Sequence, residues 1–289
     1  MNLGLLCDKR CVIGEGPIQN PIDGAVYFTN AGGNEICRWE LDTGVLSVEP
    51  VDHGVSAIAF DESGTMIVSR RDGVFRLKNG VAESLYDTDR HQILFANDMK
   101  VGPDGRIYVG TQSEKRKKIS DRIDGKLYSI DCHGTVRQLL DGLLLSNGMD
   151  WSMDETHFYH TDSDTRIIRE YLFDKQTGDI EATGRAVTVP GVDGFCMDRN
   201  DRLHVACWGQ SHVAVVDTHT MQIEEYLPVP AKKSASCAFA GKDLRTLVVV
   251  TASLNSDLET DPCAGFTFAA ERLIGGRPPY LFPINQFKR

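Results

Sequence analysis

Four polar residues stand at matching distances before strand-like stretches of this sequence. They are Glu15, Asn97, Asn147 and Asp193, and each precedes such a stretch by 11 or 12 residues. Carboxylate and amide oxygens are the ligands that hard divalent cations prefer in proteins. If the four side chains meet, they predict an all-oxygen metal site, and a metal ion beside a carboxylate can activate water for hydrolysis.

The strand-like stretches recur along the whole chain. Their first residues are Tyr27, Ile67, Tyr108, Tyr159, His204 and Val249, so successive starts lie 40 to 51 residues apart. A period of this length is typical of propellers, in which each blade is a sheet of about four strands. No segment has convincing helical periodicity. We therefore predict an all-β fold, a six-bladed β-propeller with four-stranded antiparallel blades around a central channel, formed by residues 1–289 as a single domain.

Such a fold would bring the four polar residues together, because equivalent positions of radial repeats face one axis. The other two repeats place Ser56 and Cys237 there, and we interpret both as channel-lining residues without chemistry because no histidine base accompanies them. Taken singly, an Asn-Gly or Asp-Gly pair is more often an ordinary turn, by roughly three to one. Because four such candidates occupy matching repeat positions, we favour a metal site over four unrelated turns. The N-terminal segment, residues 1–13, is expected to add a strand to the last repeat and close the ring.

Composition excludes several classes of function. The chain has 31 Lys and Arg against 41 Asp and Glu, and its net charge of −10 argues against a nucleic-acid or acidic-membrane partner. The basic run at Lys115–Lys118 belongs to an insertion, which we interpret as a solvated loop that could also cover the site. We expect a small-molecule partner and a monomer or weak homo-oligomer.

Cysteine and histidine spacing gives no sign of a zinc site or a redox motif. The eight cysteines are scattered without a CxxC pair, which is typical of free thiols in a reducing compartment. His157 and His160 are three apart, so on a strand they would point to opposite faces. No segment approaches the roughly 20 apolar residues of a membrane span, and the N-terminus lacks a leader pattern. We expect a cytoplasmic protein.

Nearly the whole chain resembles the senescence marker protein/gluconolactonase family, also called regucalcin-like proteins. The resemblance is carried, in order, by GEGP at 14–17, ANDMKVGPDGRIYVGT at 96–111, SNGMDWS at 146–152, YHTDS at 159–163, VDGFCMDRNDRLHVACW at 192–208 and SASCAFAGKDLRTLVVVTA at 234–252. It implies a six-bladed propeller that hydrolyses aldonolactones such as glucono-, xylono- or arabinono-lactone. It also implies one divalent cation, Ca²⁺, Mg²⁺, Mn²⁺, Zn²⁺ or Fe²⁺, in the channel.

The resemblance also implies roles for individual residues. Glu15, Asn147 and Asp193 would hold the cation, and Asn97 would lie beside it and contact substrate. These are the four residues that the repeat spacing selects. The family's usual substrate-binding arginine, two residues before the asparagine, is Phe95 here, so the substrate is expected to be less hydroxylated or held differently. Glu114 is the nearest candidate for the acidic substrate contact of the following loop.

The chemistry that follows is lactone hydrolysis by a metal-dependent carboxylic ester hydrolase. Asp193 is our candidate general base, a role that contributes about 10²–10⁴-fold, and Asn97 would donate a hydrogen bond to the developing oxyanion. Trp208 is equally well explained as core or as a substrate wall. Two alternatives stay open: a non-enzymatic calcium-binding or interaction propeller, and a phosphotriester-type hydrolase on the same scaffold.

Overall fold

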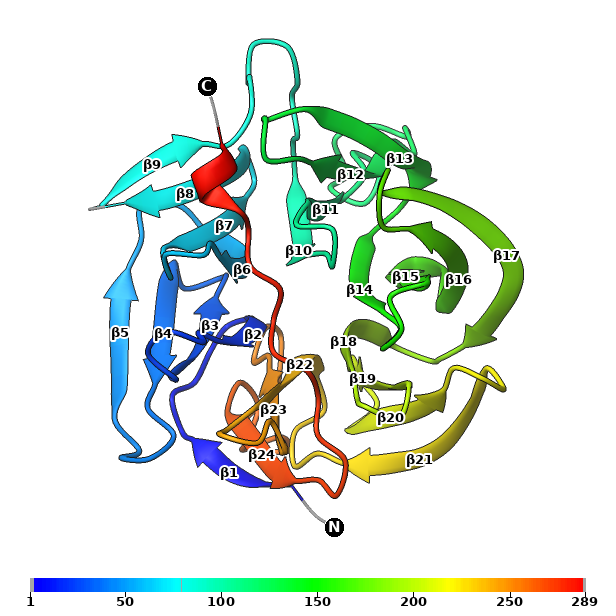
Figure 1. The fold of residues 1–289 in the computed structure, drawn as a ribbon. Coiled ribbons are helices and arrows are strands. Elements are labelled where there is room, and N and C mark those ends of the chain that lie inside the picture. Colours follow the sequence, from blue (N-terminus) through cyan, green and yellow to red (C-terminus); the bar gives the residue numbers. More distant parts are fainter. Residues whose placement is uncertain (1–2, 79, 288–289) are drawn as a thin grey trace.

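Six antiparallel sheets of four strands each surround a central channel (Figure 1). They are seen in a computed structural model that describes residues 3–78 and 80–287. The six-bladed propeller predicted from the repeats is therefore confirmed. Within the described residues the helical elements are two short 3₁₀ turns, η1 (Ser163–Thr165) and η2 (Ile284–Gln286).

Blades 1 to 3 follow one another along the chain, each running from its innermost to its outermost strand. Blade 1 consists of β2 (Gly14–Gln19), β3 (Val26–Asn30), β4 (Glu35–Trp39) and β5 (Leu46–Pro50). Blade 2 consists of β6 (Val55–Phe60), β7 (Met66–Arg70), β8 (Gly73–Lys78) and β9 (Val81–Ser84). Blade 3 consists of β10 (Ala96–Val101), β11 (Ile107–Thr111), β12 (Gly125–Ile130) and β13 (Val136–Leu143).

The last three blades complete the ring. Blade 4 consists of β14 (Ser146–Trp151), β15 (His157–Asp162), β16 (Ile167–Asp174) and β17 (Asp179–Thr188). Blade 5 consists of β18 (Val192–Met197), β19 (Arg202–Cys207), β20 (His212–Asp217) and β21 (Gln222–Pro228). Blade 6 consists of β22 (Ser234–Ala240), β23 (Thr246–Thr251), β24 (Thr267–Glu271) and the N-terminal β1 (Gly4–Cys7). The predicted N-terminal strand therefore closes the ring, as the pairing of β1 with β24 confirms.

Turns between strands are built by aspartates that accept hydrogen bonds from the backbone two residues further on. Asp61 Oδ1 accepts from the N–H of Ser63 at 2.8 Å, and Asp198 Oδ1 accepts from that of Asn200 at 2.8 Å. Hydrogen bonds of this kind, from the backbone N–H to a nearby aspartate side chain, stabilise a tight turn of the chain. Both turns join an inner strand to the next strand of its blade.

Apolar side chains fill the spaces between neighbouring blades. Between blades 3 and 4, the ring of Trp151 lies 4.9 Å from that of Tyr108 and 5.0 Å from that of Phe158, and all three side chains are buried. Aromatic pairs at such distances contribute about 0.5–1.5 kcal/mol beyond the area they bury. This packing fixes the angle between the blades and hence the positions of the inner strands.

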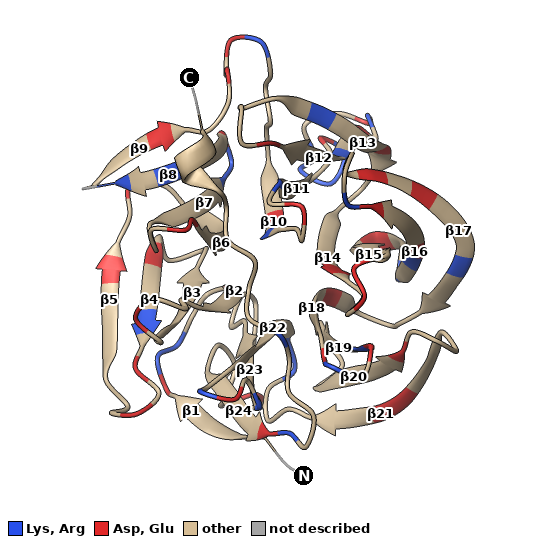
Figure 2. Cartoon of the chain, in the orientation of Figure 1, with Lys and Arg blue, Asp and Glu red and all other residues tan. Residues whose placement is uncertain are grey.

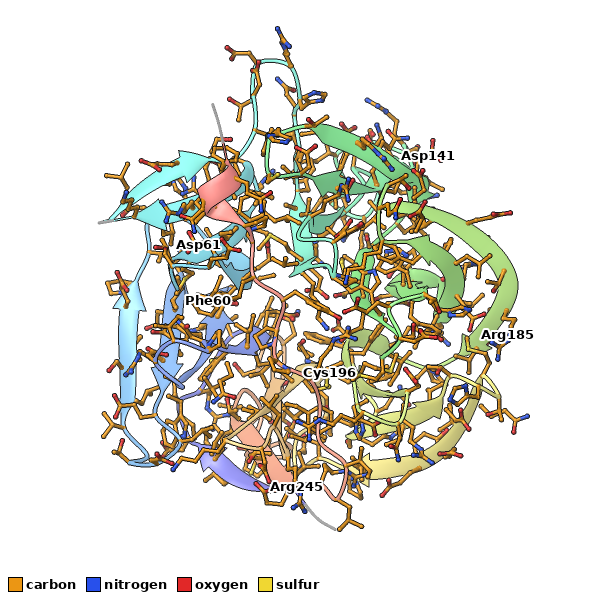
Figure 3. The ribbon with its side chains drawn as sticks, viewed as in Figure 1. Phe60, Asp61, Asp141, Arg185, Cys196 and Arg245 are labelled. Carbon is orange, nitrogen blue, oxygen red and sulfur yellow. The ribbon has the colours of Figure 1, made fainter. Side chains whose placement is uncertain are left out.

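Charged residues lie mainly on the outer strands and connecting loops (Figure 2). Labelled residues in Figure 3 illustrate the radial order: Cys196 of β18 lies near the channel, whereas Arg185 of β17 lies at the periphery. The eight cysteines are free thiols, in agreement with the scattered spacing in the sequence. No described helix is long and apolar enough to cross a membrane.

One end of the channel is crossed by the C-terminal strap, residues 275–283 (Figure 1). Gly276 pairs with Asp198 of blade 5, and Phe282 pairs with Asp61 of blade 2. Both contacts are made just beyond the C-terminal ends of inner strands. The strap therefore closes this end and leaves the opposite end, where the inner strands begin, as the mouth of the channel.

Candidate metal and substrate site

A cavity of about 660 Å³ opens where the inner strands begin. Its floor contains Glu15, Asn97, Asn147 and Asp193, each the second residue of an inner strand. The repeat spacing in the sequence predicted these equivalent positions, and the structure brings all four to one cavity. A volume of this size is in the range of pockets that hold small molecules.

Irregular pairing at the start of the inner strands shapes this floor. The register shifts between Ala96 and Met99 in β10, between Ser146 and Met149 in β14, and between Val192 and Phe195 in β18. A bulge breaks the strict alternation of side chains and re-aims them locally. Gly148 permits the close approach of two such strands, because a Cβ there would lie 2.5 Å from the carbonyl oxygen of Asp193.

The three candidate metal ligands come from three blades. Asn147 of β14 donates a hydrogen bond from its amide nitrogen to Asp193 Oδ1 of β18, and both side chains are buried. Glu15 of β2 is close enough to Asp193 for the two carboxylates to interact. Burial, together with the negative charges of Asp193 and Asp98, raises the pKa of Glu15 well above its ordinary value. Burial and Asp98 raise the pKa of Asp193 in the same way.

This set of donors fits a divalent cation. Within the described residues, neither Glu15 nor Asp193 forms an ion pair with lysine or arginine, and no donor bonds the amide oxygen of Asn147. Buried acids of like charge are unfavourable without a counter-charge, and a cation bound by two carboxylates and an amide oxygen would supply it. Within the described residues no cluster of three His, Cys, Asp or Glu side chains is found, here or elsewhere, so the Asn147 amide oxygen would have to complete the ligand set.

Asn97 is held in one orientation beside these ligands. Its amide nitrogen donates to the carbonyl oxygen of Ser146 at 3.1 Å, and its amide oxygen accepts from Gln112 at 2.9 Å. Because a primary amide has two N–H groups, one remains to donate toward a molecule in the cavity. Gln112 also lines the cavity and was not predicted from the sequence.

Asp98 is a further acid near the channel, half-buried, that was not predicted from the sequence. Desolvation raises its pKa, partly opposed by the positive charge of Lys100. Lys100 in turn donates to Asp150 Oδ2 at 2.8 Å, on the strap side of the channel. Alternation along a strand would aim Asp98 away from its neighbour Asn97, but the bulge in β10 lets both influence the channel. The sequence feature from which this acid could have been predicted is its place directly after Asn97.

Cys237 does not occupy the position predicted for it. Ser234 is the β22 residue that pairs with the last residue of β23, Thr251, so the equivalent of Asp193 is Ala235 rather than Cys237. Val249, from which the residues were counted back, lies one residue beyond the position equivalent to His204. The β22–β23 pairing also continues one residue pair further than the β18–β19 pairing, to Ala240 and Thr246. Cys237 instead lies toward the strap, with its Sγ 3.8 Å from that of Cys196.

The second predicted lining residue, Ser56, does face the cavity. Its hydroxyl donates to the carbonyl oxygen of Ala96 at 3.0 Å and therefore joins blade 2 to blade 3. The two histidines of β15 are separated as expected. His160 is buried and bonds Ser146 Oγ at 2.7 Å, whereas His157 bonds Thr156 at the surface.

The two further predicted substrate contacts differ in position. Phe95 lines the cavity, with a left-handed backbone (φ 57°) held by its N–H bond to the Arg71 carbonyl at 2.7 Å. Glu114 is not among the cavity-lining residues. Its carboxylate accepts a hydrogen bond from Ser120 at 2.6 Å inside the β11–β12 loop. The same loop presents Arg116 and Lys117 to the cavity instead.

The walls of the cavity differ in character. Trp208, after β19, lines one side, which supports its interpretation as a substrate wall. On the other side lie basic residues of blades 2 to 4, namely Arg71, Arg116, Lys117 and Arg166. Two residues of the basic run at Lys115–Lys118, Arg116 and Lys117, therefore lie at the mouth of the site. Their position agrees with a loop that covers the site.

Known proteins resemble this chain over nearly its full length. Residues 13–253 match the family model described as SMP-30/gluconolactonase/LRE-like region. Chicken (Gallus gallus) regucalcin is 31% identical over 94% of this chain and 95% of its own. The Bacillus subtilis protein YvrE, named for a proposed sugar lactone lactonase activity, is 30% identical over 98% of this chain and 99% of its own.

Solved structures agree with the fold. A calcium-binding protein, regucalcin, from Agrobacterium tumefaciens has a TM-score of 0.86 at 24% identity, covering 98% of this chain and 97% of its own. A gluconolactonase from Xanthomonas campestris has a TM-score of 0.75 at 19% identity, covering 94% and 89%. Six four-stranded blades, the matched family model and these relatives lead to one conclusion: the chain belongs to the SMP-30/gluconolactonase/LRE-like family.

Proposed function

We propose that this protein is a metal-dependent lactonase that opens the ester ring of a sugar-acid lactone. The observation that carries the proposal is the floor of the cavity, where Glu15, Asn147 and Asp193 gather a half-buried carboxylate, a buried carboxylate and an amide without a positively charged partner among the described residues. A scaffold has no need of such an arrangement. Relatives named for lactonase activity support the same reaction class.

Glu15, Asn147 and Asp193 would hold the divalent cation. When bound, the cation supplies Lewis acidity, which polarises an ester carbonyl and makes water more acidic. Calcium, magnesium and manganese suit an all-oxygen donor set best, and zinc and iron(II) are further candidates. The relatives named regucalcin favour calcium among them.

The residues of the chain have separate tasks in the hydrolysis. Asp193 accepts a proton from the water that attacks the lactone carbonyl, and later gives a proton to the ring oxygen as the C–O bond breaks. Asn97, oriented by Gln112, donates its remaining N–H to the oxygen on which negative charge develops. Trp208 and Phe95 exclude water on two sides of the substrate.

The test is acid release by metal-stripped protein. Glucono-, xylono- and arabinono-lactone and simple aliphatic lactones are offered, each divalent ion is added back in turn, and Asp193→Ala is assayed alongside. We expect metal-restored hydrolysis that Asp193→Ala lowers by at least about 10²-fold. A metal ion that raises the melting temperature while no lactone opens faster than in buffer would instead identify a calcium-binding propeller, and phosphotriesters would be assayed next.

A further inference from the structure

Four cations form a rim on one side of the cavity mouth, here called the basic rim. They are Arg71, Arg116, Lys117 and Arg166. They come from three successive blades: the turn after β7, the loop between β11 and β12, and the residue that ends η1 before β16. All four are exposed, so each charged group can reach a molecule at the mouth.

Most of this positive charge is not neutralised. Within the described residues Arg116 pairs with Asp164 at 3.6 Å, but Arg71, Lys117 and Arg166 form no ion pair. The chain has ten more acidic than basic residues, 41 against 31, so unpaired cations gathered in one place are unusual for it. Asp164 neutralises one of the four cations, which leaves a local excess of three positive charges. The two ligand carboxylates of the floor do not cancel this excess when a divalent cation occupies them.

The basic rim is compact. The pKa of Lys117 is lowered by partial desolvation of its ammonium group and by the positive charges of Arg116 and Arg71. Arg116 is also close enough to the floor for its charge to act on Asp193. Like charges held together repel each other, and an anion between them relieves that repulsion.

Arg71 is held toward the mouth by Phe95. Its guanidinium lies over the Phe95 ring, 4.7 Å from the ring centroid, and its carbonyl oxygen accepts the Phe95 N–H at 2.7 Å. An arginine stacked on an aromatic ring keeps its N–H donors for another partner. Phe95 therefore serves as a platform for a cation from the neighbouring blade.

The opposite wall has a different character. Ile13, Pro190, Trp208 and Leu254, from blades 6, 1 and 5 and their connections, present apolar surface to the cavity. A ligand that fills the cavity consequently meets cations on one side and apolar groups on the other. Such asymmetry orients a molecule whose charge is at one end.

We propose that the substrate is an anionic lactone, one that carries a carboxylate or phosphate group in addition to its ester ring, and that the basic rim binds this group. The proposal rests on the lactonase function above and names its substrate class. The ring carbonyl lies at the floor and the anionic group lies against Arg71, Arg116, Lys117 and Arg166. Guanidinium groups suit both anions because their paired N–H donors match two oxygens.

The test compares lactones that differ at one position. Metal-loaded protein is assayed with D-glucono-1,4-lactone, with D-glucaro-1,4-lactone, which has a carboxylate in place of the terminal hydroxymethyl group, and with 6-phospho-D-glucono-1,5-lactone against its unphosphorylated parent. We expect kcat/KM to be at least about tenfold higher for the anionic member of a pair, and the ratio to fall with added salt. Whether the carboxylate or the phosphate pair gives the larger ratio identifies the anion.

Variants connect the preference to the basic rim. Arg71→Gln and Arg166→Gln should each lower the anionic-to-neutral ratio by about tenfold, since each removes one charge-assisted contact. Lys242→Gln is the matched control, because its side chain is 92% exposed on the β22–β23 turn and it removes the same charge. It should leave the ratio unchanged.

The outcomes separate this proposal from the lactonase proposal. Equal or faster hydrolysis of the neutral lactones, unaltered in ratio by Arg71→Gln, overturns the anionic substrate and leaves the lactonase intact. If no lactone opens, calorimetric titration of metal-loaded protein with D-glucarate and D-gluconate gives a separate answer. Tighter binding of the dianion that Arg71→Gln abolishes supports the basic rim, and equal affinity refutes it.

Discussion

The amide of Asn147 donates a hydrogen bond to the carboxylate of Asp193, so the second residues of two neighbouring inner strands are joined at the floor of the channel. The bond connects β14 of blade 4 to β18 of blade 5. It leaves the Asn147 amide oxygen and one Asp193 oxygen as candidates for a cation. Because Glu15 comes from a third blade, a cation held by all three residues would depend on how these three blades are placed around the channel.

Removal of the Asp193 charge should make the metal-free protein more stable. The carboxylate is buried near Glu15 and Asp98, and its raised pKa means that the folded state disfavours its charge. Asp193→Asn is expected to increase the free energy of unfolding at pH 8 by about 1–3 kcal/mol, measured by urea denaturation in EDTA. It should also abolish the rise in melting temperature that a divalent cation gives the wild type.

A surface acid provides the control for this experiment. Asp42→Asn removes one charge from a side chain that is 82% exposed, and its effect should stay within about 0.5 kcal/mol. A destabilised Asp193→Asn protein in EDTA would mean that the carboxylate is favourably hydrogen-bonded without a metal, contrary to the interpretation of the floor as a cation site.

The strap should contribute to stability through Arg277. Its guanidinium donates to Asp150 Oδ1 and, at 3.1 Å, to the carbonyl oxygen of Ser152, while Lys100 holds the other Asp150 oxygen at 2.8 Å. Arg277→Ala leaves a buried carboxylate with one cation fewer, which is expected to cost about 1–3 kcal/mol in urea denaturation. Arg199→Ala, which loses one exposed bond to the Asp243 carbonyl, should cost less than about 0.5 kcal/mol.

Phe95 should influence which neutral lactones are accepted. An arginine at this position would add donors at the cavity wall, and its longer side chain would displace the Arg71 guanidinium from its stacked position. We expect Phe95→Arg to raise the kcat/KM ratio of gluconolactone to a simple aliphatic lactone by about tenfold, the value of one charge-assisted hydrogen bond. Phe95→Leu removes the ring without adding donors and should not raise that ratio. An unchanged ratio in Phe95→Arg would place the substrate hydroxyls elsewhere.

Acid should destabilise the protein partly through His160. Burial and the positive charge of Arg169 lower its pKa to about 3. The unfolded state, with an ordinary pKa near about 6.5, therefore binds one more proton between these values, and stability falls as pH drops through this window. By pH 4 the loss relative to pH 7 should be about 3 kcal/mol from this group.

The variant His160→Gln isolates that contribution. Glutamine can still bond Ser146 Oγ but does not titrate, so the slope of unfolding free energy against pH between 4 and 6 should decrease by about one proton. His157→Gln, on the same strand, is the control because that side chain bonds Thr156 at the surface. The same slope in His160→Gln and wild type would show that other groups account for the acid sensitivity.

Most of the floor of the site could be predicted because it lies in repeat register. Glu15, Asn97, Asn147 and Asp193 are equivalent residues of four inner strands, and a radial fold brings equivalent positions together whatever the details of packing. Ser56 was placed correctly by the same argument. The period of the apolar stretches was sufficient for the six-bladed architecture as well.

Other features depended on local departures from that register. The bulge in β10 made Asp98 relevant to the floor, and a bulge leaves no mark in the alternation of residue types. The pairing of β22 with β23, which is one residue pair longer than that of β18 with β19, moved Cys237 away from the floor. Glu114 was selected by its distance along the chain, but Ser120 holds its carboxylate within its own loop. Loops are not governed by the repeat, so their side chains cannot be located by counting residues.

What this sequence determines by itself is thus the set of strands, their radial order and the residues aimed at the axis, since these follow from periodicity and side-chain alternation. The three-dimensional structure alone decides the surroundings of the floor. Arg71, Arg116 and Arg166 lie far apart in the chain and meet at one mouth only because three blades pack side by side. Charge and shape at that mouth are tertiary properties, and substrate choice depends on them.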